Sequence, residues 1–306
     1  MRKSLLIAVL AWSSASQADE AGSASVTRAI RAVIDGSQSW MTSGKPDWYD
    51  RLAGVKLAGP SGELVESRGD LDRQFAMCPV AETTWKLGAI SLGVDAKRGF
   101  AWFQAPVVVD ETCATAGFAA PSASETLRAS GILVVEKSTW RLVALALSRQ
   151  LPDARLFQLA TALPARGEPN LDDTPAAIAA ASWFTPGGFA RGKWQGDAVA
   201  SGTDPGEMGT GAAALRLASA WDSIHLRAQS IAATTFAGGR IALVRADVRL
   251  PVKAKAAAMT LYAIAVVDDT TKTWRWTSLQ FTSELAPLPQ LVYPDTSGME
   301  CPHGKC

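Results

Sequence analysis

Two stretches of this chain repeat one pattern, a tryptophan and an arginine followed by residues typical of a β-strand. TWRLVALALS occupies residues 139–148, and TWRWTSLQFT occupies residues 273–282. Trp140 and Trp274 are 134 positions apart, which is the length of one small domain. The chain has 306 residues and therefore has room for two such domains. This self-similarity constrains the fold more than any other feature, because it predicts one domain built twice.

Further segments recur in the same order in the two halves. The first half contains them at 54–69, 84–94, 97–109 and 127–148, and the second at 198–211, 220–230, 238–250 and 261–282. Matched residues are separated by 143, 136 and 141 positions, in the pairs Gly59 and Gly202, Trp85 and Trp221, and Ala101 and Ala242. We interpret the unequal offsets as loops of different length, since loops accept insertions more readily than strands do.

Each half is expected to begin with a helix and to continue as an antiparallel sheet. Thr27 is a candidate N-cap before an apolar stripe over residues 30–34, and Thr174 is one before Pro175 at the first helical position. Segments rich in Val, Ile, Leu and Trp follow, separated by turn residues. Helices followed by antiparallel strands predict an α+β fold. Prolines are frequent between the halves, which places a linker at 152–171.

The first 18 residues have the three parts of a secretory signal. Arg2 and Lys3 precede the apolar run 5–12, and small residues follow up to Ala18. Cleavage near Ala18 would place the mature protein in the periplasm or outside the cell; a short core helix at the chain start is the alternative. No later stretch reaches about 18 apolar residues, so no membrane span is expected.

Charge and cysteine content narrow the classes of partner and compartment. The chain has 30 Lys and Arg against 29 Asp and Glu and no basic run, which argues against a nucleic-acid surface. Four cysteines in an exported protein favour disulfides. We favour the pairs Cys78–Cys113 and Cys301–Cys306 among the three connectivities, with Cys78 and Cys113 as buried thiols the alternative.

The second half resembles a SnoaL-like domain of the NTF2-like superfamily. The resemblance rests on a Gly-Thr-Asp-Pro turn, on the strand segment 238–252 and on a final WR strand. The matching residues are Gly202, Thr203, Asp204, Pro205, Glu207, Trp274 and Arg275. In the first half the segments 100–103 and 140–148 agree, and the turn keeps only Gly62 and Glu63.

The resemblance implies two tandem cone-shaped domains, each a curved antiparallel sheet packed on helices, with a pocket at the mouth. We place a degenerate first domain at 19–151, a clearer second domain at 172–286 and a cysteine-containing tail at 287–306. This superfamily includes enzymes, ligand binders and assembly modules, so the resemblance indicates fold rather than function. The glycine-rich segment 202–211 lacks a phosphate-loop ending, and we interpret it as a chain-reversing turn.

Polar residues alternate with apolar ones on two expected strands of the second half. Alternation assigns to one sheet face the residues Ser223, His225, Arg227, Gln229, Arg245, Asp247 and Arg249. A His225–Asp247 pair beside Arg245 could act as a general base with oxyanion support. The alternative, which we favour, is a face turned to solvent or to the other domain and joined by ion pairs. Residues at comparable positions of the first half are not ionisable: Ala89, Ser91, Gln104 and Val108.

Two further groups of residues are candidates for binding. Trp183, Trp194 and Trp276 have no counterpart in the first half and are candidate ligand contacts, whereas tryptophans that recur at equivalent positions are expected in the core. The tail has Met299, Cys301, His303 and Cys306 within eight residues, a set that suits copper or zinc. Its spacing fits no standard zinc motif, and we favour a small disulfide loop instead.

These observations leave three functions open. The favoured one is an exported, non-catalytic tandem protein that binds a small apolar ligand or a partner protein, without a cofactor. The second is a cyclase or isomerase type of enzyme that uses acid–base chemistry in the second domain, and the third is metal handling by the tail. The strand at 142–147 is apolar on both faces, so we expect the first sheet to be covered by its own helices and by the second domain, a pairing that would take the place of a homodimer.

Overall fold

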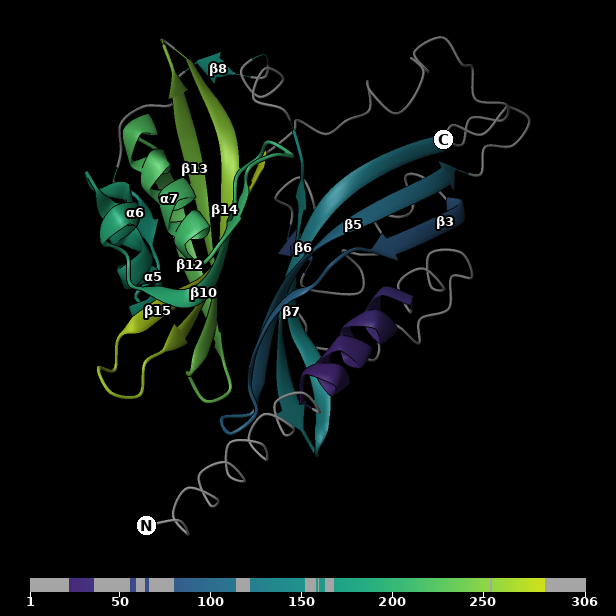
Figure 1. Ribbon diagram of the computed structural model, residues 1–306. Helices are drawn as coiled ribbons and strands as arrows, with labels where there is room; N and C mark the ends of the chain where they lie inside the picture. Colours follow the sequence, from purple (N-terminus) through teal and green to yellow (C-terminus); the bar gives the residue numbers. More distant parts are fainter. Residues whose placement is uncertain are drawn as a thin grey trace, which may run out of the picture.

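The computed structural model describes residues 22–35, 56–58, 64–65, 80–113, 122–151, 158, 160–162, 168–253 and 255–283. Two sheets lie face to face, with a helix over residues 22–35 on the outer side of the first and helices α5 to α7 on the outer side of the second (Figure 1). Antiparallel pairing dominates both sheets, so the α+β expectation agrees with the structure. No helix among the described residues is long and apolar enough to cross a membrane.

The first sheet runs in the order β2-β1-β7-β6-β5-β3, and β4 pairs with β5. Its strands are β1 (Lys56–Ala58), β2 (Leu64–Val65), β3 (Val80–Leu87), β4 (Ser91–Asp95), β5 (Phe100–Cys113), β6 (Ser122–Glu136) and β7 (Thr139–Arg149). The helix over 22–35 packs Val26 and Ile30 onto this sheet. Thr27 lies inside that helix, so the expected N-cap is wrong: residue 22 is already helical, and the buried stripe includes Val26.

The second sheet runs in the order β11-β10-β15-β14-β13-β12-β9, and β8 pairs with β14. Its strands are β8 (Thr161–Ala162), β9 (Asn170–Leu171), β10 (Trp194–Ser201), β11 (Met208–Thr210), β12 (Arg227–Phe236), β13 (Ile241–Val252), β14 (Lys255–Val267) and β15 (Trp274–Ser283). Its helices are α5 (Pro175–Ala181), η1 (Ser182–Phe184), α6 (Gly188–Arg191), α7 (Ala212–Trp221) and η2 (Asp222–Ile224). Strands β8 and β9 come from the segment expected to be a linker.

The two sheets have the same strand topology. In each, a short hairpin, β1–β2 or β10–β11, pairs in parallel with the last strand, β7 or β15, and the preceding strands follow in antiparallel order. The registers correspond too: Phe100 pairs with Val134, and Ile241, 141 positions later, pairs with Val266. Both final hairpins contain an irregularity at the same place, after Ile132 and after Ile264. Ala101 and Ala242, one of the matched pairs in the sequence, therefore occupy the same register position.

The sequence match between Trp85 and Trp221 is wrong. Trp85 lies on β3, whereas Trp221 ends helix α7, and the strand expected at 220–230 begins only at Arg227. Ala214, Ala218 and Trp221 are buried on one helical stripe, and this spacing continues the helix to Trp221. By contrast, Thr174 caps α5 as expected, and its hydroxyl accepts a hydrogen bond from the backbone N–H of Ala177.

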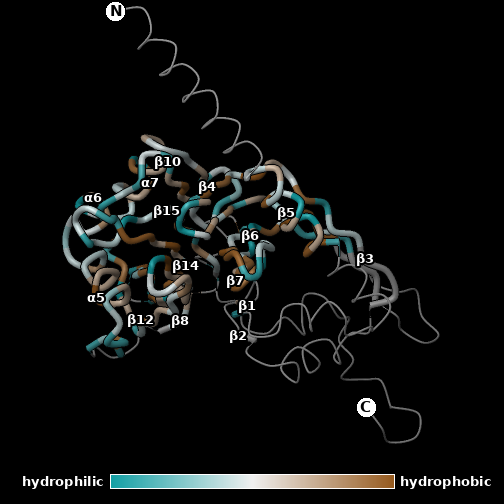
Figure 2. The backbone as a smooth tube through the Cα atoms, turned by 90° about the horizontal axis from the view of Figure 1, so that it is seen from below, coloured by the Kyte–Doolittle hydropathy of each residue, from teal (hydrophilic) through white to brown (hydrophobic). Residues whose placement is uncertain are grey.

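The sheets bury an apolar layer between them. This inter-sheet core consists of Phe100, Trp102, Ile132, Val134 and Ala144 from the first sheet and Val199, Ile241, Leu243, Ile264 and Val266 from the second. A view turned by 90° also places β7 beside β14 at the junction (Figure 2). The apolar strand β7 is covered on both faces, as expected: Leu142 and Leu145 pack under the N-terminal helix, and Ala146 packs against Tyr262.

Candidate functional site

The centre of the inter-sheet layer holds a buried amide network. The side-chain nitrogen of Gln104 donates to Ser201 Oγ at 2.8 Å and to Gln280 Oε1 at 3.3 Å. Gln280 in turn donates to the backbone carbonyl of Ala146 at 3.2 Å. Buried polar groups of this kind fix one relative position of the two sheets, because another position would leave them without partners.

The Gly-Thr-Asp-Pro turn is held by an arginine of the first sheet. Arg128 on β6 is 3% exposed, and its guanidinium donates to the backbone carbonyls of Gly202 at 2.6 Å, Asp204 at 3.1 Å and Pro205 at 3.0 Å. Burial lowers the pKa of Arg128, and the negative charges of Glu207 and Asp204 oppose this shift. The turn that carries the sequence resemblance thus contacts the other sheet.

The turn is closed by its own side chains. The backbone N–H of Gly202 donates to the carbonyl of Glu207, and the N–H of Asp204 donates to Glu207 Oε2. A Cβ atom at Gly202 would lie only 1.8 Å from Glu207 Oε2, so glycine permits the carboxylate to approach. The interpretation as a chain-reversing turn agrees with this geometry.

The face of the second sheet under α5 to α7 is filled with aromatic side chains. Trp183 lies 3.9 Å from Trp276 between ring centroids and stacks on Phe189 at 5.6 Å. Trp221 packs edge-on against Phe189 and Phe281. Trp183 and Trp276, two of the candidate ligand contacts, are therefore core residues. The third, Trp194, is partly buried against the same core, and its indole N–H donates to the carbonyl of Phe189.

The other face of the second sheet carries the predicted polar residues. Arg245 and Asp247 lie on β13, on the face that continues the inter-sheet layer beyond Ile241 and Leu243. Arg245 Nε donates to Asp247 Oδ1 at 2.9 Å, and Ser230 donates to Asp247 Oδ2 at 2.5 Å. This face therefore carries an ion pair between Arg245 and Asp247, both of the second sheet.

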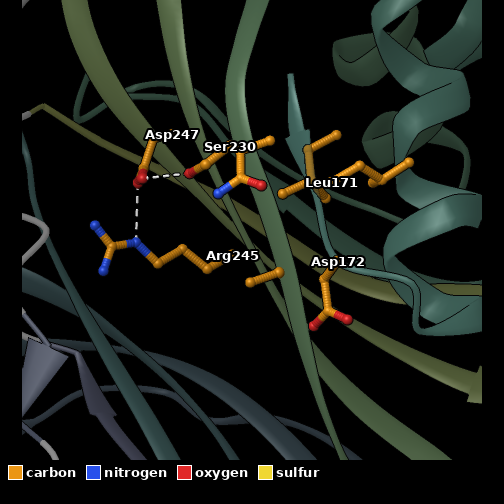
Figure 3. A pocket seen from close by; sticks show the side chains of 8 residues that line it. Leu171, Asp172, Ser230, Arg245 and Asp247 are labelled. Carbon is orange, nitrogen blue, oxygen red and sulfur yellow. Dashed lines mark hydrogen bonds and ion pairs between the residues drawn. The ribbon is translucent and has the colours of Figure 1, made fainter. Parts of the chain in front are cut away.

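A cavity of about 340 Å³ opens beside this ion pair (Figure 3). Its lining residues are Asn170, Leu171, Asp172, Ser230, Ile231, Ala232, Arg245 and Asp247. Asp172 accepts hydrogen bonds from the backbone N–H groups of Thr174 and Ala233, and it thereby anchors β9 and the start of α5 to β12. The cavity is the candidate site, because it joins an exposed apolar side chain, Leu171, to a fixed pair of opposite charges.

His225 takes no part in lining this cavity. It is exposed, has a left-handed backbone (φ 50°) and connects η2 to β12, so it does not lie on the strand that the sequence predicted. The neighbouring polar residues Arg227 and Arg249 do pair across β12 and β13. Sequence reasoning missed Asn170 and Leu171, which fell in the expected linker, and Asp172, the first residue of the expected second domain. The one signal was Asp172, an acidic residue two positions before the Thr174 cap.

Several predictions fall on residues that the structure does not describe. These are the signal segment 1–18, Cys78, Cys301 and Cys306 and the remaining tail residues Met299 and His303; Cys113 ends β5, but its side chain is not described. Within the described residues, no three His, Cys, Asp or Glu side chains are grouped so that they could hold a metal ion.

No protein-family model matches the chain, and no curated protein matches it. Among solved structures, an uncharacterised cystatin-like protein from Caulobacter vibrioides is similar, with 16% identity over 42% of this chain and 92% of that one and a TM-score of 0.33. An NTF2-like superfamily protein from Salmonella enterica has 16% identity over 42% and 94%, with a TM-score of 0.34. The association domain of CaMKII from C. elegans has 12% identity over 43% and 98%, with a TM-score of 0.33.

Proposed function

We propose that this chain is a fused pair of NTF2-like domains, residues 19–151 and 172–286, that is exported by its signal segment and acts as a non-catalytic binding protein. One observation carries the proposal. The described cavity places the exposed apolar side chain of Leu171 beside Asp247, which is already bonded to Arg245 and Ser230.

The duplication is supported by the strand topology rather than by sequence identity. Six strands of each sheet follow one order, with the parallel pair and the hairpin irregularity in corresponding places. Residues at corresponding positions also meet in the inter-sheet core: Phe100 corresponds to Ile241, and Ile132 to Ile264. A contact that uses the same patch from both partners is the arrangement of a two-fold dimer. In this proposal the linker has converted a homodimer into one chain.

The hydrogen bonds that Asp247 accepts favour binding over catalysis as the function. Its oxygens accept hydrogen bonds from Ser230, Arg245 and Thr260, which occupy three of a carboxylate's roughly four acceptor positions. His225 is not available as the partner base, because it does not line the cavity. His225 and Asp247, the predicted acid–base pair, therefore do not line one pocket in the described part of the chain.

A ligand screen with a blocked variant tests the proposal. We expect ligand-observed NMR on the mature chain to find small molecules whose signals broaden, and Ala232→Trp, which places an indole in the cavity, to abolish that broadening. Ala220→Trp on the exposed side of α7 is the matched control and is expected to leave binding unchanged. Conversion of any bound compound to product, lost in Asp247→Asn, would overturn the non-catalytic assignment.

A further inference from the structure

Strand β12 is covered by β9 along only part of its outer edge. β9 pairs with Ser230 and Ile231, and the chain then leaves the sheet toward α5. The backbone groups of alternate residues point outward along an edge strand. The Ile231 carbonyl accepts from the N–H of Asp172 at 2.9 Å, so Ala233 and Thr235 face outward as well. Among the described residues, the Ala233 carbonyl and both backbone groups of Thr235 have no hydrogen-bond partner.

This part of the edge has none of the usual protection. Exposed edges in natural proteins carry lysine, proline or a bulge, which keep a further strand from adding. Residues 232–236, AATTF, contain no charge and no proline, and the bulge of β12 lies earlier, between Ala228 and Ser230. By contrast, the outermost strand of the first sheet, β3, carries Lys86, which pairs with Asp110. An uncharged edge with unpaired backbone groups can accept an extended segment.

The cavity beside this edge is negative on the side of β9. Two carboxylates, Asp172 and Asp247, line it with one cation, Arg245, which leaves one negative charge in excess. Figure 3 shows the terminal nitrogens of Arg245 pointing away from Leu171 and Asp172. Asp172 accepts two backbone N–H groups, so about two acceptor positions of its carboxylate remain. A lysine or arginine side chain complements this charge.

The cavity also offers room and apolar surface to an added strand. Leu171 ends β9, is exposed, and lines the cavity together with Ala232. Its apolar area is removed from water when another chain packs against it. Side chains of a strand alternate between the two faces of a sheet, so every second residue of an added strand would point to the face that carries Asp247. A volume of about 340 Å³ accommodates one long side chain.

We propose that β12 binds an extended, basic peptide segment of another protein as an added strand along residues 232–236, with one lysine or arginine side chain in the cavity near Asp172. The inference rests on the proposed binding function and specifies the partner. The chain's own tail complements the edge less well, because residues 287–306 contain four prolines and two acidic residues against one lysine.

The test uses the mature chain and three sets of acetylated heptapeptide amides built from Val and Thr. The first set has one lysine at each central position in turn, the second has glutamate instead, and the third has lysine and methylated backbone nitrogens. We expect the Thr235 N–H to exchange rapidly with solvent in the free chain and to be protected by the first set. By amide shifts, the other two sets should bind at least about tenfold more weakly, since they lack the positive charge or the backbone donors.

Two pairs of variants assign the contacts. Thr235→Pro removes an outward N–H and leaves the ladder to β13 in place, so it should abolish binding of the lysine set, whereas Thr235→Ala keeps the N–H and should retain binding. Asp172→Asn should weaken binding by about fivefold or more. Asp173→Asn, at an exposed neighbour that does not line the cavity, should leave it unchanged.

Each contrary outcome has its own meaning. A Thr235 N–H that is protected in the free chain would overturn the proposal: protection lost on dilution would assign the edge to a second copy, and protection at every concentration to another segment of this chain. Equal binding of the lysine and glutamate sets, or undiminished binding by Thr235→Pro, would overturn it too. Small-molecule binding that Ala232→Trp abolishes, without binding of any peptide, would overturn the partner and leave the binding function standing.

Loss of fold is separated from loss of contact. Unfolding midpoints of the variants show whether a lost signal comes from an unfolded chain. The methylated set is measured on the wild type, so equal binding of the methylated and unmethylated lysine sets would overturn strand addition even where a variant is unstable.

Discussion

Replacing Arg128 with alanine is expected to lower the free energy of unfolding by about 3 kcal/mol, because three backbone carbonyls of the turn at 202–205 lose their charged donor in a buried setting. The carboxylates of Glu207 and Asp204 lose a compensating charge at the same time. The two sheets would then separate more easily where β6 contacts the turn at 202–205. Urea unfolding of the full chain, followed by circular dichroism, measures the effect.

Two variants identify the cause of the Arg128 effect. Arg128→Met keeps most of the side-chain volume, so a loss close to that of Arg128→Ala assigns the effect to the hydrogen bonds rather than to packing. Arg141→Ala removes an arginine of the same sheet whose ion pair with Glu136 is largely exposed, and it is expected to cost about 0.5 kcal/mol or less. A loss for Arg128→Ala as small as that of Arg141→Ala would contradict the role given to the turn.

Replacing Trp276 with alanine is expected to lower the free energy of unfolding by about 3–5 kcal/mol, since its indole is 3% exposed and packs against Trp183. Trp194→Ala is the comparison, because Trp194 is only partly buried, and it should cost less than half as much. Guanidinium unfolding of the three proteins gives these values. Unchanged stability in Trp276→Ala together with lost ligand binding would show that Trp276 contacts ligand and does not serve the core.

The sequence predicted features set by neighbouring residues, such as strands and a helix cap, and positions that the two halves share. The final strands and the helix cap at Thr174 follow from patterns within about 20 residues of each site. The register match of Ala101 with Ala242 follows from the similarity of the two halves of the chain. The segment at 220–225 was misread because a few alternating residues fit a strand and a helix end equally well. The spacing of Ala214, Ala218 and Trp221, which all pack inward, decides in favour of the helix.

The residues that line the cavity are held together by contacts between distant parts of the sequence, which short sequence patterns do not predict. Asp172 reaches a backbone N–H on β12 across 61 positions of sequence, and Asn170 pairs with Ser230 on the same strand. Alternation grouped Arg245 with Asp247 on one face, but it could not say whether that face meets solvent, a ligand or another sheet. The same holds for Arg128, whose partners lie 74 to 77 positions away. Its only sequence signal is a single charge within the otherwise uncharged stretch LRASGILVV.

In the proposed arrangement, the faces that would form a homodimer are joined within one chain. Light scattering after size exclusion, at micromolar concentration, tests this directly. We expect the mass of one chain for the wild type. Ile264→Asp puts a charge into the inter-sheet core and is expected to give an expanded or unfolded single chain. A stable two-chain particle that Ile264→Asp splits into folded single chains would contradict the account, because the inter-sheet face would then join two molecules.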